Sequence, residues 1–224
     1  MQVTKLGHCC LVLEVNPPSG GQVVKILTDP GSFTDAQDTL TGLHILLITH
    51  EHQDHYHVES VKNVVKNNPD IEVVCNKAVA ALIQKENIPC KVSVVGDGES
   101  VTLLGVLIEG FGTEHAKVYG DTPNVENTGY MVADKFYFPG DNFHPPAVGQ
   151  ARREVSVLAL PVAGPWMKIS EAVDFAKLIK APKAFGVHDG MITPDFRPFI
   201  GMILKNYVPE TEYTALADGE SKEF

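Results

Sequence analysis

The chain has 224 residues, of which 44% are hydrophobic, and this is enough for one sizeable domain with a buried core over residues 1–224. Its formal net charge is −10 and it contains only three arginines, which argues against nucleic acid or an anionic membrane as a partner, because both need a positive surface. The sequence opens with MQVTKLGH rather than with a basic and apolar leader, and no apolar run approaches the ~20 residues that span a bilayer. We therefore expect a cytoplasmic protein whose four cysteines are reduced thiols.

The first half of the chain predicts strands followed by helices. Short β-rich runs predict strands over residues 3–6, 10–14, 23–28 and 43–49. The last of these runs reads LHILLIT and ends abruptly at His50, which is typical of a central strand that is covered on both faces. Apolar residues at helical spacing predict helices over 58–65 and 77–86, and further strands are expected over 72–75, 92–95, 101–104 and 107–111.

The second half repeats this order. Residues 112–129 carry turn-forming residues without periodicity and predict a long loop, a kind of segment that often carries function. A hairpin over 130–138, a buried strand over 155–160 and a helix over 170–179 capped by Ser170 follow. A strand over 184–187 ends at His188, Thr193 and Pro194 open a helix to about residue 205, and a last strand covers 212–215. Two such halves fit one α+β domain in which two sheets pack together with helices outside.

The strongest chemical signal is the run His50-Glu51-His52-Gln53-Asp54-His55. Residues two apart do not share a helix face, so the run is not a helical metal motif. It lies where the apolar strand ends and a helix begins, and a loop there can direct several side chains to one place. Imidazole and carboxylate ligands together suit zinc, and also iron or manganese. Three imidazoles and one carboxylate are more than one tetrahedral ion takes comfortably from a single loop, which indicates two neighbouring ions.

Two ions need further ligands, and three candidates follow in order along the chain. His115 lies in the long loop, Asp141 follows a strand in the sequence Phe-Pro-Gly-Asp, and His188 follows another strand. Each of them ends or interrupts an apolar run, as the first cluster does. Their order and their placement after the first motif favour a shared metal site.

This arrangement resembles the metallo-β-lactamase-fold hydrolases. The resemblance rests on HEHQDH followed by His115, Asp141 and His188, and it extends over nearly the whole chain. Four further segments are also similar, namely residues 5–8, 27–31, 127–130 and 160–162. They point to the branch that contains the ascorbate-6-phosphate lactonase and many small hydrolases. The family implies a four-layer αββα sandwich with a dinuclear site at one edge.

Carried over by position, the resemblance implies seven metal ligands. Three histidines would hold the first ion, namely His50, His52 and His115. A carboxylate and two histidines would hold the second, namely Asp54, His55 and His188. Asp141 would bridge both ions. The loop around His115 matches the family weakly, so Glu114 is kept as an alternative ligand.

The implied chemistry follows from two adjacent cations. Together they lower the pKa of a shared water, so that hydroxide is available near neutral pH, and they polarise the scissile carbonyl or phosphoryl oxygen. The resemblance therefore implies a hydrolase that uses metal-bound hydroxide, with Zn²⁺ favoured over Mn²⁺ or iron. It also implies that Asp54 is both a ligand and the acceptor of a proton. The expected partner is a small-molecule substrate with an ester, lactone or amide bond.

Other residues are interpreted around this site. Asp29, in the sequence Thr-Asp-Pro-Gly, is expected to accept the free N–H of a ligand histidine. His8 and His144 are candidate substrate contacts. Trp166 is interpreted as a core residue, with a place in the pocket wall as the alternative. Asp189 either orients the histidine before it or makes a turn, and the sequence does not separate these roles.

Three other functions stay open. One is a phosphodiesterase on the same fold. Its substrate would be a small phosphodiester rather than a nucleic acid, because family nucleases usually carry extra domains and basic surfaces that this chain does not show. An iron-dependent oxidoreductase would use the same ligands for oxygen or persulfide chemistry. A non-catalytic metal-binding protein is disfavoured, because loss of function would leave ligand positions free to drift. The substrate and the oligomeric state are not written in the sequence, and an acidic surface is compatible with a homo-oligomer.

Overall fold

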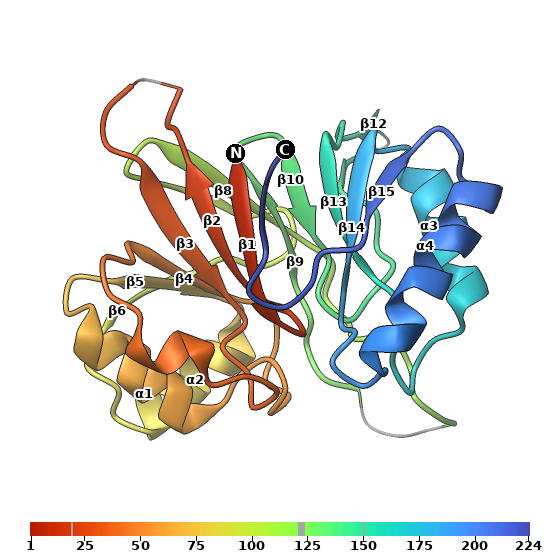
Figure 1. Cartoon of the computed structure of the whole chain (residues 1–224). Helices are drawn as coiled ribbons and strands as arrows, with labels where there is room; N and C mark the ends of the chain where they lie inside the picture. Colours follow the sequence, from red (N-terminus) through yellow and green to blue (C-terminus); the bar gives the residue numbers. More distant parts are fainter. Residues whose placement is uncertain (19, 121–123, 150) are drawn as a thin grey trace.

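Two β-sheets lie face to face in the computed structural model, which describes residues 1–18, 20–120, 124–149 and 151–224 (Figure 1). The first sheet has the spatial order β16 (Ser221–Glu223), β1 (Gln2–Gly7), β2 (Cys10–Val15), β3 (Val24–Thr28), β4 (Ile45–Ile48), β5 (Glu72–Cys75) and β6 (Lys91–Val94). The second has the order β15 (Glu212–Thr214), β14 (Lys183–Val187), β13 (Val157–Pro161), β10 (Phe136–Phe138), β9 (Gly129–Val132), β8 (Val106–Phe111) and β7 (Ser100–Leu103). A small separate hairpin consists of β11 (Ala147–Val148) and β12 (Ala151–Arg152).

Two pairs of helices cover the outer faces of the sheets (Figure 1). The first sheet carries α1 (Val58–Asn67) and α2 (Lys77–Lys85), and the second carries α3 (Ile169–Ile179) and α4 (Arg197–Tyr207). Two short 3₁₀ helices lie in connections, η1 (Ala36–Thr39) and η2 (Pro194–Phe196). The layers are therefore helix, sheet, sheet and helix, which confirms the predicted αββα sandwich. Within the part of the chain that the structure describes, no helix is both long and apolar enough to cross a membrane.

Three apolar clusters hold these layers together. The central cluster lies between the sheets, and the two outer clusters join each sheet to its helices. The strand β4 contributes to two of them: Ile45 and Leu47 belong to the central cluster, whereas Leu46 and Ile48 belong to the outer one. Burying one such side chain stabilises the fold by about 1.5–3 kcal/mol. This double burial explains why the strand before the metal motif is apolar at every position.

Strand ends from both sheets meet at one edge of the sandwich. The strands β3, β4 and β5 are parallel, as are β10, β13 and β14, so the carboxyl ends within each set share an edge. His50 follows β4, Asp141 follows β10 and His188 follows β14. The fold therefore brings side chains from distant parts of the sequence to the same place.

The start of α3 differs from the prediction. The helix begins at Ile169, and its N-cap is Lys168 rather than Ser170. The Lys168 N–H donates to the Glu171 carboxylate at 2.6 Å, so an acidic side chain within the first turn satisfies the backbone donor of the N-cap residue itself.

Two further differences concern the C-terminal segments. Thr193 precedes the short helix η2, whereas α4 begins only at Arg197. The strand β16 was not predicted, because Ser-Lys-Glu has no apolar alternation. It joins the edge of β1 through backbone pairing, with Gln2 opposite Glu223, and this pairing places the two chain ends side by side (Figure 1).

Candidate metal centre

The loop after β4 carries four of the predicted ligands, and its course depends on close contact with the loop after β3. His50 and His55 are buried, whereas His52 and Asp54 are partly exposed. Gly31 lies so close that a β-carbon there would be 1.7 Å from the carbonyl oxygen of Asp54. Only glycine fits at this position, and the contact holds the ligand loop against the neighbouring strand end.

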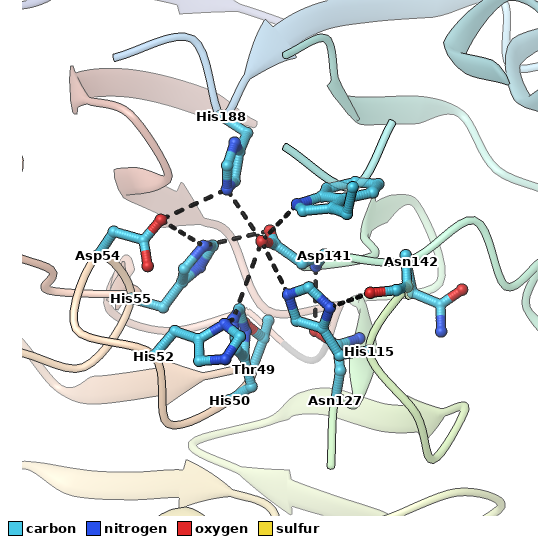
Figure 2. A network of polar contacts seen from close by, with 12 residues as sticks. Thr49, His50, His52, Asp54, His55, His115, Asn127, Asp141, Asn142 and His188 are labelled. Carbon is cyan, nitrogen blue, oxygen red and sulfur yellow. Dashed lines mark hydrogen bonds and ion pairs between the residues drawn. The ribbon is translucent and has the colours of Figure 1, made fainter. Parts of the chain in front are cut away.

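All seven predicted ligands converge at the edge of the sandwich, with the carboxylate of Asp141 among them (Figure 2). The first half-site consists of His50, His52 and His115. The second half-site consists of Asp54, His55 and His188. The ligand atoms of the first half-site and Asp141 all lie within 4.8 Å of one another, and so do those of the second half-site and His8.

Three imidazoles face Asp141 in the first half-site. His115 Nε2 lies 3.2 Å from Asp141 Oδ2, and His50 Nε2 lies 3.9 Å from the same oxygen. His52 Nδ1 lies 3.1 Å from His50 Nε2. One ring nitrogen of each of these histidines lies within 4.8 Å of a carboxylate oxygen of Asp141.

The second half-site approaches both oxygens of Asp141. His188 Nε2 lies 2.9 Å from Asp141 Oδ2, and His55 Nε2 lies 3.1 Å from Asp141 Oδ1. Asp54 Oδ2 is 3.5 Å from His188 Nε2 and 3.7 Å from His55 Nε2. His188 has a left-handed backbone with φ of 57°, a costly conformation for a residue with a β-carbon, which the surrounding contacts hold in place.

Hydrogen bonds on the outer ring nitrogens fix which nitrogen of three histidines faces the centre. Asp29 Oδ2 accepts from His55 Nδ1 and from the hydroxyl of Thr49, both at 2.7 Å. Because Thr49 donates its proton to Asp29, its oxygen accepts from His50 Nδ1 at 3.0 Å. His115 Nδ1 donates to the carbonyl of the next residue. When these three rings are neutral, Nδ1 carries the proton and Nε2 carries the lone pair that can bind a cation.

Asp141 is held by two residues that the sequence analysis did not place at the metals. Its N–H donates to Asn127 Oδ1 at 3.0 Å, and Asn127 Nδ2 donates to the carbonyl of Pro139 at 3.0 Å. The indole N–H of Trp166 donates to Asp141 Oδ2 at 2.9 Å. Trp166 therefore belongs to the centre and not only to the core.

Charge is distributed unevenly between the two half-sites. In the first, burial lowers the pKa of His50 well below its ordinary value and also lowers the pKa of His52. In the second, burial opposes protonation of His188, but the Asp141 carboxylate outweighs it and raises the pKa to about 9. The pKa of His55 is raised well above its ordinary value against burial, again mainly by Asp141. His50 and His52 in the first half-site thus favour the neutral imidazole, whereas His55 and His188 in the second favour imidazolium.

The residues present fit a pair of divalent cations. In the described part of the chain, four buried polar atoms of the predicted ligands have no hydrogen-bond partner, and three of them are at the centre: His55 Nε2, His188 Nε2 and Asp141 Oδ1. A buried polar atom without a partner costs about 1–3 kcal/mol, and a cation bound between these atoms would satisfy all three. Imidazole nitrogens with carboxylate oxygens are the donor set that zinc, manganese and iron accept.

A cavity of about 310 Å³ opens onto the centre. Its lining includes five of the predicted ligands, namely His52, Asp54, His115, Asp141 and His188. Its apolar lining consists of Phe33, Val118, Pro165, Trp166 and Met191. A small molecule in this cavity would therefore contact the ligand atoms and the apolar walls together.

His8 lies beside the second half-site. Its Nδ1 accepts from the N–H of Gly190 at 3.2 Å, so in the neutral ring the proton is on Nε2. Nε2 lies 3.3 Å from Asp54 Oδ2 and donates to it. His8 thus contacts a predicted ligand, but it is buried and is not among the side chains that line the cavity, so its role as a substrate contact stays a prediction.

The structure separates the remaining candidates. His115, and not Glu114, joins the ligand group, because the Glu114 side chain is exposed outside it. His144 is exposed, its ring lies next to Gly112, and it is not among the side chains that line the cavity. The structure therefore does not bring His144 to the metal centre.

Asp189 forms a buried ion pair, which neither of its two interpreted roles included. Lys5, from β1, is fully buried and its Nζ lies 2.6 Å from Asp189 Oδ2, and Arg197 Nε lies 3.1 Å from the same oxygen. Lys5 also donates to the carbonyl of Gly186 at 3.0 Å. These contacts tie the loop that carries His188 to the opposite sheet.

Residues 2–188 match the Beta-lactamase superfamily domain, and the chain belongs to this family. Protein Rv0786c from Mycobacterium tuberculosis is 35% identical over 202 residues, which cover 88% of each chain. Igni18, a metallo hydrolase from the archaeon Ignicoccus hospitalis, has a TM-score of 0.75 at 17% identity, over 100% of this chain and 98% of that chain. CmlA, a diiron β-hydroxylase from Streptomyces venezuelae, has a TM-score of 0.72 at 14% identity, over 100% of this chain and 54% of that chain.

These comparisons confirm the metallo-β-lactamase fold and support an enzyme of the metal-dependent hydrolase class. The finer prediction of an ascorbate-6-phosphate-lactonase-like branch stays a prediction.

Proposed function

We propose that this chain is a hydrolase that uses two divalent cations, with zinc favoured, to cleave an ester, lactone or amide bond of a small molecule. The observation that carries the proposal is the position of Asp141, whose carboxylate lies within reach of both half-sites and at a cavity. The first half-site would hold one cation, the second would hold the other, and Asp141 would contact both. When bound, two such cations lower the pKa of a water molecule and polarise the scissile carbonyl oxygen.

Several residues of the chain orient the predicted metal ligands. Asp29 fixes the His55 ring directly and the His50 ring through Thr49, so one buried carboxylate serves both half-sites. Trp166 and Asn127 hold Asp141 from outside. Preset ligand positions raise metal affinity, because less conformational entropy is lost when a cation binds.

Asp54 is the residue that we propose accepts a proton from the attacking water. Its side chain is 18% exposed and lines the cavity, whereas that of Asp141 is only 3% exposed. Burial raises the pKa of Asp54, but its contacts with His188 and His8 outweigh burial and hold the pKa well below its ordinary value. The carboxylate is therefore ionised at neutral pH and available as a proton acceptor.

Iron chemistry is the second candidate function, and the fold shared with the diiron enzyme CmlA favours it. The same imidazole and carboxylate atoms accept iron as well as zinc. The identity of the bound metal therefore separates hydrolysis from oxygen chemistry.

The test combines metal analysis with a substrate panel. Protein purified without added metal is analysed for its elements, and we expect about two zinc ions per chain; stoichiometric iron would overturn the zinc preference. Activity is then measured on ester, lactone, amide and phosphodiester substrates, with Asp54→Asn as the matched variant. We expect cleavage of an ester or lactone and a loss of about 10²–10⁴-fold in the variant. Cleavage of phosphodiesters alone would favour the phosphodiesterase, and an equally active Asp54→Asn would remove Asp54 from the mechanism.

A further inference from the structure

The mouth of the cavity at the metal centre is apolar. Phe33, Val118 and Met191 line it, and they are 48%, 50% and 46% exposed. They come from three separate segments: the loop after β3, the long loop after β8 and the turn after β14. Apolar side chains are ordinarily scattered singly over a surface, so three of them around one polar centre indicate a place that receives an apolar group.

The deeper wall is apolar as well. Trp166 is only 7% exposed and lines the same cavity beside Pro165. Its indole N–H is turned to Asp141, so its ring lies next to the shared carboxylate. At the second half-site Phe33 packs against the ring of His8, with the ring centroids 4.7 Å apart. An apolar group in the cavity would therefore lie within reach of the ligand atoms.

Lysine and arginine side chains do not line this cavity within residues 1–18, 20–120, 124–149 and 151–224, and its only basic side chains are the predicted ligands His52, His115 and His188. Lys5 is buried against Asp189 at 2.6 Å, and Arg197 pairs with Asp189 at 3.1 Å and with Asp218 at 3.0 Å. A phosphate or carboxylate group away from the scissile bond would meet no charged partner in these walls. The net charge of −10 adds an unfavourable field for such a group.

We propose that the cavity binds an uncharged ester or lactone through a short apolar group, which packs among Phe33, Met191 and Trp166 while the scissile bond lies at Asp141. This inference rests on the proposed hydrolase function. The volume of about 310 Å³ is at the small end of ligand sites, which range over roughly 300–1,000 Å³, so the apolar group has only a few carbon atoms. Each methylene that the walls bury is expected to raise kcat/KM about fourfold.

The first experiment measures kcat/KM of the metal-loaded protein on 4-nitrophenyl acetate, butyrate and hexanoate, and on the 4-nitrophenyl monoester of succinate. Acetate and butyrate differ by two methylenes, so we expect a rise of about 16-fold from acetate to butyrate, with butyrate preferred over its charged succinate counterpart by at least as much. Equal values along the series, or preference for the succinate monoester, would overturn the inference and leave the hydrolase function intact.

Phe33→Ala and Phe199→Ala are the matched variants. Phe199 lies on α4 and is 45% exposed, close to the 48% of Phe33, but it lines a separate groove with Ile203 and Tyr207. Phe33→Ala is expected to remove most of the chain-length dependence, and Phe199→Ala to retain it. The same flattening in both variants would overturn the role of Phe33.

A binding measurement separates this inference from the proposed function. Trp166 is the single tryptophan of the chain, so its fluorescence reports directly on the cavity wall. Methyl ketones of matching chain length carry no leaving group and are titrated against the metal-loaded protein. If no ester, lactone or amide is cleaved, the hydrolase proposal fails, but tighter binding of the longer ketones still supports the apolar site. Chain-length-independent ketone binding overturns the apolar site whether or not esters are cleaved.

Discussion

The two half-sites contain similar side chains but differ in charge and in support. In the first, His50 is held by a neutral hydroxyl and His115 by a backbone carbonyl. In the second, His55 is held by the carboxylate of Asp29, whereas His188 Nδ1 is buried without a hydrogen-bond partner among the described residues. Burial lowers the pKa of His50, and the carboxylate of Asp141 raises that of His188 to about 9 against burial.

Because of this difference, we expect the two cations to bind with different affinities at neutral pH. A ligand histidine must be neutral to bind a metal, so a proton competes with the cation wherever the pKa of the histidine is high. In the first half-site, the lowered pKa values of His50 and His52 keep these two histidines neutral near pH 7. The second holds imidazolium groups against carboxylates, and its cation has to displace protons. We therefore expect the first half-site to fill before the second at neutral pH.

The largest expected effect comes from removing the residue that the half-sites share. Asp141→Ala should lower metal content from about two ions to fewer than one, because both cations lose a ligand. Activity should fall by more than the ~10–100-fold that follows loss of an outer hydrogen-bond partner of a metal ligand. Elemental analysis and kcat/KM measure these effects, and thermal unfolding with a chelator present checks that the variant folds. Retention of one full equivalent of metal would show that one half-site does not need Asp141.

Asp54→Asn should change the second half-site and leave the first unchanged. The amide keeps the shape of the side chain but binds a cation more weakly and is no longer a proton acceptor. We expect the second cation to be lost while the first stays, with activity reduced by about 10²–10⁴-fold. Stepwise titration with Zn²⁺ in a calorimeter gives the two affinities separately. Weakening of the first step alone would reverse the assignment of Asp54 to the second half-site.

Metal affinity should depend on pH more steeply at the second half-site than at the first. Below a pKa of about 9, His188 carries a proton that the second cation must displace, so affinity falls as pH falls. One released proton corresponds to about tenfold in affinity per pH unit, or roughly 100-fold between pH 8 and pH 6. The raised pKa of His55 acts in the same direction. The first step should change less over this range, since the pKa of His50 lies well below its ordinary value. Equal slopes for the two steps, read by calorimetry in several buffers, would contradict the charge difference.

The sequence predicted the parts of the centre that are local in the chain. Four ligands are contiguous in one loop, and each of the other three follows or interrupts an apolar run. Periodicity along the chain also predicted two packed sheets with helices outside, and the family resemblance implied their four-layer αββα order. Asp29, at a strand end, was expected to accept a hydrogen bond from a ligand histidine, and the structure places it against His55.

The missed contacts are long-range. Trp166 bonds to a carboxylate 25 positions away, and Lys5 pairs with Asp189 across 184 positions. Neither residue belongs to a local pattern, since a tryptophan after a strand or a lysine within one is typical of many folds. Only the packing of one sheet on the other brings these groups together.

The smallest effects are expected from substitutions of the residues that accept hydrogen bonds from the outer ring nitrogens of the ligand histidines. These substitutions test which half-site each hydrogen bond supports. Asp29→Asn replaces the carboxylate that His55 and Thr49 share, and it should weaken the second cation by about 10–100-fold. Thr49→Val removes the acceptor of His50 Nδ1 and the hydroxyl donor to Asp29 but leaves the Asp29–His55 bond in place, so it should weaken the first cation by about tenfold. Thr4→Val is the matched control, because Thr4 Oγ1 bonds to Ser221 Oγ at 2.7 Å, at the β1–β16 edge and outside the metal groups.

The same stepwise Zn²⁺ titration measures all three variants. If Asp29→Asn weakens both steps equally, Asp29 controls His50 through Thr49 as strongly as it controls His55 directly. The two half-sites would then share one anchor, and the difference between them would lie in charge alone. If only the second step changes, the hydrogen bond from His50 to Thr49 is independent of Asp29, and the half-sites are supported separately.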